Sequence, residues 1–275
     1  MNYIEIITNI IKNCSSDIEF DFNTINNILI NIHSTTNYYY GKVVPLFNND
    51  GLQFELLLHH NIINDLISDD KDKVQHSHSV IYHELYHCKE IAITSQYINC
   101  GKAYLDETMS TTKMLLFSTA VKQWSEYYAY YNSSQIRGRD IKLSNYICAA
   151  EAAVNVLHSK LLEVSDIQMP LFFINDIVKF IQICVMLSAH YNSTHEKRYK
   201  NEVDYLKRSS IYNKYYPYLI DLVYVMQELY TAYPNWVSEK TFMELGYKLF
   251  SFIKINGITY STDELSDNFI FVKGN

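Results

Sequence analysis

The sequence HELYH at residues 83 to 87 constrains this chain more strongly than any other feature. His83 and His87 are four residues apart, so on an α-helix both imidazoles lie on one face and can bind one metal ion. Glu84 is rotated by about 100° from His83 and can point toward a water molecule on that metal. The flanks suit burial of the helix, through Val80, Ile81, Leu85, Cys88 and Ile91. The pattern predicts a half-buried helix with a zinc site; the alternative is that the histidines only make polar contacts there.

A catalytic zinc site needs a third protein ligand besides the two histidines and a water molecule. A third histidine within HExxHxxGxxH is excluded, because Glu90 stands where this motif has its glycine and Ile93 stands where it has its last histidine. Glu126 lies in KQWSEYYAYYNSS, on an aromatic-rich helix where a lone carboxylate has little reason to be buried unless it is paired. We predict Glu126 as the third ligand, with Glu151 as the first alternative and His158 as the second.

The combination of HELYH with the helical EYYA roughly forty residues later resembles the gluzincin-type zinc metallopeptidases. With a small sheet before the motif helix, residues 38–132 are similar to the ImmA/IrrE-like peptidases. This resemblance implies that His83, His87 and Glu126 bind one zinc ion per chain and that Glu84 is the catalytic base. After the glutamate, YYNSSQIRGRD replaces the small residues and the proline of that family's pattern.

These residue types imply hydrolysis of peptide bonds. Zinc lowers the pKa of its bound water toward about 7 and polarises the scissile carbonyl group, while Glu84 takes the proton of the water and passes it to the leaving amine. A donor to the oxyanion, commonly Tyr or His, has to come from elsewhere, and the 25 tyrosines do not single one out. The segment LQFELLLHH, residues 52–60, is predicted to be the edge strand along which a peptide or protein substrate lies. The competing hypothesis is a non-catalytic zincin-like scaffold whose helical half binds a partner protein.

Two other histidine pairs are not predicted to form a second metal site. His76 and His78 are two residues apart, which does not put them on one face of a helix, and we expect both to be solvent-exposed. His59 and His60 are neighbours on a predicted strand and therefore face opposite sides of it. At most one of this second pair could reach the site.

The predicted fold class is α+β and mainly helical, with a zincin-like small N-terminal sheet, the HExxH helix and a helical C-terminal half. Only 7 glycines and 4 prolines occur in 275 residues, which favours long helices. Strands are predicted at 38–47 and 52–60, around the turn NNDG and with Pro45 at an edge or a bulge. Residues 1–135 would form the catalytic region, and residues 136–275 a helical region packed on it. Helices outside the motif are predicted at 2–14, 23–33, 109–132, 144–163, 171–191, 195–208, 217–231 and 239–254.

Charge and cysteine content exclude several other classes of protein. The net charge is −7 and no basic cluster is present, which argues against nucleic-acid binding. The five cysteines form no CxxC pair, so we expect reduced thiols and a cytoplasmic protein. No signal peptide is recognisable at the N-terminus. The most apolar stretch, MPLFFINDIVKFIQICVMLSAHY, contains Asn175, Asp176 and Lys179 and is therefore predicted to be a buried helix and not a membrane span.

Overall fold

The structure, a computed structural model, forms two compact units. Residues 1–96 and 128–139 make up the first unit, and residues 97–127 and 140–275 the second. Helix α5, Thr112–Ser133, is continuous and contributes residues to both. The division of the chain at residue 135 stays a prediction. The structure describes residues 3–31, 40–49, 51–101, 112–134, 148, 151–152, 155–156, 159, 166–168, 171–193, 197–260 and 270–273.

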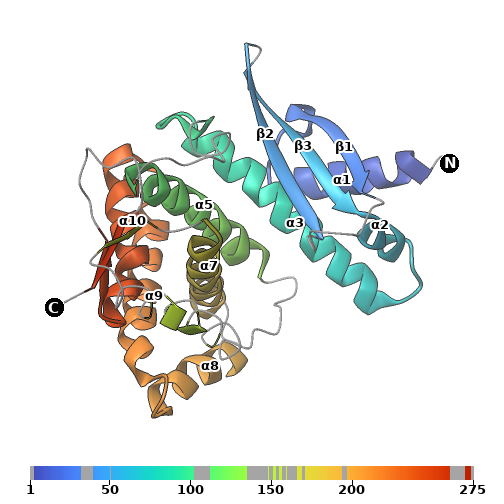
Figure 1. Ribbon diagram of the computed structural model, residues 1–275. Coiled ribbons are helices and arrows are strands. Elements are labelled where there is room, and N and C mark those ends of the chain that lie inside the picture. The colour runs from blue at the N-terminus through green and yellow to red at the C-terminus, as the bar shows by residue number, and fades with distance from the viewer. Residues whose placement is uncertain are drawn as a thin grey trace. The chain divides into compact units, whose positions relative to one another are not determined.

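The first unit contains a three-stranded sheet in the order β1-β3-β2 (Figure 1). Strands β2, Gly41–Asn48, and β3, Gly51–His59, form the predicted antiparallel hairpin, which is thereby confirmed. Pro45 lies on β2, an edge strand of this sheet, as predicted. The strand LQFELLLHH, however, is β3 and lies in the centre. Its prediction as the edge strand is wrong.

Strand β1, Ile25–Asn31, occupies a segment for which a helix was predicted at 23–33. It pairs in parallel with β3, after a 3-10 turn at Phe22–Thr24. The register shifts between Ile25 and Asn27, as in a β-bulge. A bulge interrupts the two-residue alternation of a strand, so the apolar residues follow one another at spacings that resemble those of a helix. The helix prediction is wrong for this reason.

One face of this sheet is buried under helices. Phe54, Leu56 and Leu58 of β3 are completely buried on that face. Helix α3 packs against β2 and β3, and helices α1 and α2 pack against α3 (Figure 1). The bounds are Tyr3–Asp17 for α1, His60–Leu66 for α2 and Lys71–Thr94 for α3. The predicted helix at 2–14 and the helix around HELYH are therefore confirmed.

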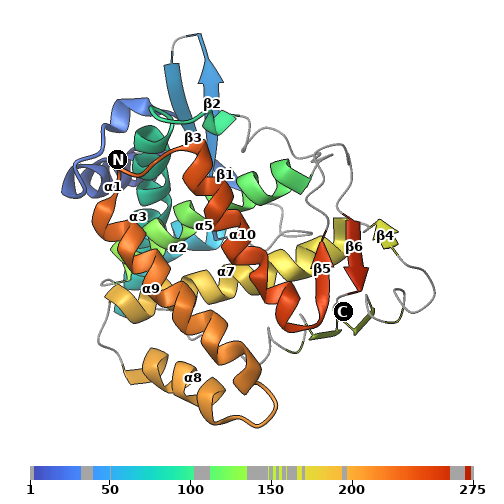
Figure 2. The ribbon, with the colours of Figure 1, turned by 90° about the vertical axis from the view of Figure 1, so that its left-hand side faces the viewer.

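The second unit is mainly helical, as predicted for the C-terminal part of the chain. Figure 2 shows α9 packed beside both α7 and α10. The apolar face of α9 is buried, and Asn192 of α7 donates a hydrogen bond to the carbonyl oxygen of Val223 on it. Trp124 of α5 packs against Trp236 and Tyr233 in the same core. The helices are α7 Leu171–Ser193, α8 Lys197–Arg208, α9 Tyr216–Ala232 and α10 Glu239–Ile255, with a 3-10 turn at Asn213–Tyr215.

A second, small sheet was not predicted. It consists of β4, Asp166–Gln168, β6, Ile270–Lys273, and β5, Ile258–Tyr260, in that order and antiparallel. Most of the predicted helix at 144–163 lies outside the described residues. Within the described part of the chain, no helix is both long enough and apolar enough to cross a membrane.

Candidate metal centre

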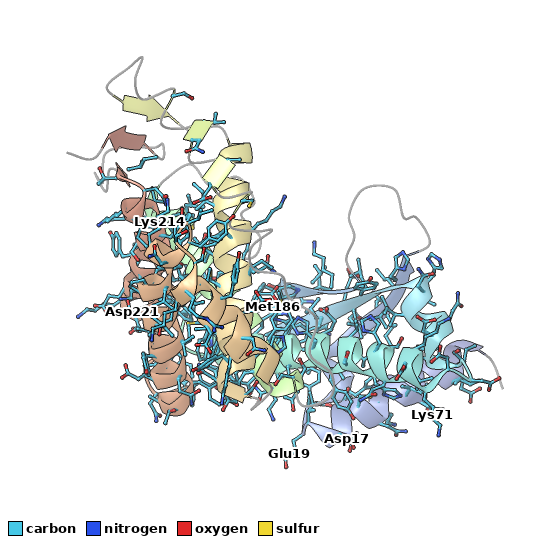
Figure 3. The ribbon with its side chains drawn as sticks, turned by 90° about the horizontal axis from the view of Figure 1, so that it is seen from below. Asp17, Glu19, Lys71, Met186, Lys214 and Asp221 are labelled. Carbon is cyan, nitrogen blue, oxygen red and sulfur yellow. The ribbon has the colours of Figure 1, made fainter. Side chains whose placement is uncertain are left out.

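Helix α3 carries the HELYH residues and is fixed at its start and along one side. The carboxylate of Asp70 accepts hydrogen bonds from the first backbone N–H groups of the helix and caps it. Along one side, Tyr82 donates a hydrogen bond of 2.5 Å to Asp17, which is labelled in Figure 3. Lys89 donates to the carbonyl oxygen of Ile18 at 2.7 Å. These contacts fix the rotation of the helix about its own axis. The side chains on its other faces therefore point in fixed directions as well.

His83 and His87 face each other on this helix. Their Nε2 atoms are 3.1 Å apart, and their ring centroids are 4.6 Å apart. Two nitrogen ligands of one tetrahedral zinc ion, each bound at roughly 2.0 to 2.1 Å, lie about 3.3 Å from one another. The pair therefore has the separation that a shared zinc ion requires. Without a metal ion, one ring can donate an N–H to the other.

Glu126 of α5 completes a group of three potential ligands. One ligand atom from each of His83, His87 and Glu126 lies within 4.8 Å of the other two. All three side chains are half-buried. Tyr130, one helical turn after Glu126, packs against His83 in a tilted arrangement, with ring centroids 4.3 Å apart and an angle of 49° between the rings. This is the single such group of His, Cys, Asp and Glu side chains among the residues that the structure describes.

Glu84 is almost completely buried, with 6% of its surface exposed. Its side chain lies against the main chain of Gly41 at the start of β2. Because β2 is an edge strand of the sheet among the described residues, this carboxylate lies near that edge. The three ligand residues and the predicted base thus occupy neighbouring positions on α3 and α5.

Burial controls the protonation of two groups in the motif helix. It lowers the pKa of His87 to about 4, so the ring is uncharged at neutral pH and its nitrogen can bind a metal ion. Burial, and after it the negative charge of Glu84, raises the pKa of the Cys88 thiol well above its ordinary value. Cys88 therefore stays protonated at neutral pH in the metal-free protein.

The alternative third ligands are not part of this group. Glu151 accepts a hydrogen bond of 3.1 Å from Tyr215 and lies 3.5 Å from Lys214, both within the second unit (Lys214 is labelled in Figure 3). Its carboxylate is therefore already engaged. His158 lies outside the described residues.

The remaining histidines make other contacts. His59 accepts a hydrogen bond from the backbone N–H of Asn61 and caps α2. His76 packs edge-on against Tyr40, and His78 lies 3.7 Å from the sulfur of Cys14. Both histidines of the 76/78 pair are half-buried, so their predicted exposure is wrong.

The sequence analysis missed two residues of this region, Tyr130 and Gly41. Tyr130 could have been found, because a residue four positions after Glu126 lies on the same face of the helix. Gly41 carries no such local signal, since its contact with Glu84 depends on how β2 crosses α3.

Comparisons with protein-family models, with curated proteins and with solved structures found no match for this chain. The function can therefore be inferred only from the arrangement of these side chains. This arrangement offers two imidazoles and one carboxylate to a cation, a set that occurs in catalytic zinc sites, and a second carboxylate close by.

Proposed function

We propose that this protein is a zinc-dependent peptidase in which His83, His87 and Glu126 hold one zinc ion. The observation that supports the proposal is the group of three ligand atoms within 4.8 Å of one another, with Glu84 next to His83 in sequence. Two histidines and one glutamate leave a fourth position open on a tetrahedral ion. An ion bound there polarises a carbonyl group and makes water more acidic. Glu84, as the base, accepts a proton from water and donates it to the leaving amine.

The substrate in this proposal is an extended peptide that pairs with the edge of β2. The backbone N–H of His59 donates to the carbonyl oxygen of Tyr40, its direct partner in the ladder, at 2.9 Å. Hydrogen-bonded and non-bonded pairs alternate in an antiparallel ladder. The N–H and C=O of Gly41 and Val43 therefore point away from β3, toward the side where a further strand could add. This edge takes the role that the sequence analysis assigned to residues 52–60.

Metal analysis of single variants tests the proposal. The wild-type chain should hold about one zinc ion, and His83→Ala and His87→Ala should each lose it. Glu84→Gln should keep the metal and lose hydrolysis of a mixed library of quenched fluorescent peptides, because the amide cannot accept the proton. His59→Ala is the matched control, since His59 caps α2, packs against His60 and is not part of the metal-binding group. Unchanged zinc content in His87→Ala would end the proposal.

The same measurements separate the enzyme from a non-catalytic zinc-binding scaffold. A scaffold that uses zinc only for stability would bind the ion but hydrolyse no peptide in the library. The enzyme should lose hydrolysis on removal of zinc by a chelator and regain it when zinc is returned.

A further inference from the structure

Gly41, the first residue of β2, lies against the side chain of Glu84. A Cβ atom on Gly41 would lie 2.6 Å from Cγ, 2.8 Å from Oε1 and 3.0 Å from Cδ of Glu84, and these atoms are its three nearest neighbours. Cβ atoms essentially never approach other heavy atoms to less than 3.0 Å. Any other residue at this position would therefore force the side chain of Glu84 or the start of β2 to shift.

The direction of this contact follows from the register of the sheet. Gly41 pairs with Leu58, whose side chain is buried on the face that α3 covers. Side chains of directly paired residues lie on the same face of a sheet. A side chain at position 41 would thus point toward α3, where the carboxylate of Glu84 lies.

The backbone gives no other reason for a glycine here. The φ angle of Gly41 lies outside the positive range, whereas Gly51 has a φ of 110° in the hairpin turn. Glycine inside a strand is less favourable than alanine, because it loses more conformational freedom on folding. Glycine in a strand often marks a close approach by another group. Here that group is the carboxylate of Glu84.

We infer that Gly41 is a positioning residue for Glu84: its bare main chain lets the carboxylate pack against β2, which holds it beside His83 and His87. This inference rests on the proposed function, in which Glu84 is the base. A base has to lie within hydrogen-bond reach of the proton it takes, and a displacement of about 1 Å can lower a rate about 100-fold. In this role Gly41 provides only the space for the carboxylate; its N–H and C=O, which Gly41→Ala retains, remain able to pair with the substrate.

Unfolding of four zinc-free full-length proteins tests the contact without any enzyme assay: wild type, Gly41→Ala, Glu84→Ala and the double variant. Gly41→Ala should lower the thermal midpoint by roughly 2 to 10 °C while Glu84 is present, because the added methyl group overpacks the contact. In the Glu84→Ala background it should change the midpoint little, because the atoms it would meet are gone. A folded double variant beside an unfolded Gly41→Ala protein would support the same contact. An equal cost in both backgrounds would overturn it.

Gly246→Ala is the matched control, because its Cβ would meet the carbonyl oxygen of Leu116 at 2.6 Å within the second unit. It should lower the midpoint equally with and without Glu84.

Zinc content and steady-state kinetics then test the positioning role. Gly41→Ala should keep about one zinc ion per chain and an unchanged KM, while kcat falls about 100-fold. An unchanged kcat in a folded, zinc-loaded Gly41→Ala protein would overturn the inference. A wild-type protein that hydrolyses no peptide would instead end the proposed function, and the unfolding comparison would still decide whether Gly41 makes room for Glu84.

Discussion

In the proposed zinc site, replacement of Glu126 should remove most of the stabilisation expected from zinc binding. A ligand that binds only the folded state stabilises it by about 2.7 kcal/mol when its free concentration is 100 times Kd. In a domain of 150 to 250 residues, 1 kcal/mol moves the thermal midpoint by roughly 2 to 4 °C. The wild-type midpoint should therefore rise by roughly 5 to 10 °C in zinc buffered at that level.

The loss of zinc affinity expected in Glu126→Ala can be estimated, because Glu126 is one of three proposed ligands. Mutation of groups that merely orient a ligand lowers metal affinity about 10- to 100-fold, so loss of one ligand in three should cost at least about 100-fold. At the same free zinc concentration the stabilisation then falls to about 0.4 kcal/mol, a shift of about 1 °C. Calorimetry of each protein, in zinc buffer and in chelator, measures both shifts.

Glu151→Ala is the control for this experiment. It breaks the hydrogen bond with Tyr215 and the ion pair with Lys214, which should cost about 1 kcal/mol with and without zinc. The shift caused by zinc should stay at its wild-type size. A full zinc shift in Glu126→Ala would refute the assignment of Glu126. If Glu151→Ala abolished the shift instead, the third ligand would be Glu151.

Three further outcomes are expected. The folded state keeps His87 neutral down to its pKa of about 4, whereas the unfolded chain protonates it near 6.5. The unfolded state therefore binds the extra proton between these values, and the zinc-free protein should lose stability as the pH falls from about 6.5 to 4. Allowing for the partial exposure of His87, the free energy of unfolding should fall by about 2 kcal/mol over this pH range. Urea titrations at several pH values should show this fall in the wild type but not in His87→Gln. Tyr130→Ala should lower zinc affinity about 10-fold, measured in competition with a chromophoric chelator, because it removes the ring that contacts His83. Tyr130→Phe keeps that ring and should keep the affinity. An equal loss of zinc affinity in both variants would show that the ring contact does not orient His83. Leu222→Ala, at a completely buried position of α9, should lower the free energy of unfolding by about 2 to 5 kcal/mol, measured with denaturant. Tyr224→Ala, at a position that is 66% exposed, should lower it by less than about 0.5 kcal/mol.

The helices and the hairpin could be predicted because their signals are local. The spacing of apolar residues gave α7, α9 and α10, and Ser238 caps α10 as a serine before such a pattern should. Strand β1 could not be predicted in this way, because its pairing with β3 and the bulge at Ile25–Asn27 depend on residues far along the chain.

The wrong prediction of an edge position for residues 52–60 follows from the missing strand β1. Without β1, the strand at 52–60 has only one neighbour, the strand at 38–47, and an edge position is therefore expected for it. In the candidate site, the spacing alone singles out His83, Glu84 and His87, and the carboxylate on an apolar helix singles out Glu126; the structure brings His83, His87 and Glu126 together. The contact of Glu84 with Gly41 joins two elements and has no sequence pattern of its own.

Pro45 has a consequence for the behaviour of this protein at high concentration. An exposed edge strand can pair with the edge of another molecule and so begin aggregation. In the ladder of β2 and β3, Pro45 faces Phe54 at a non-bonded pair, four residues after Gly41, so its ring nitrogen points outward. A proline there breaks no bond to β3, yet it offers no N–H to an incoming strand. The half of this edge from Pro45 to Asn48 is thereby less suited to indefinite self-association, while the half at Gly41 and Val43 keeps the backbone groups with which the proposed substrate would pair.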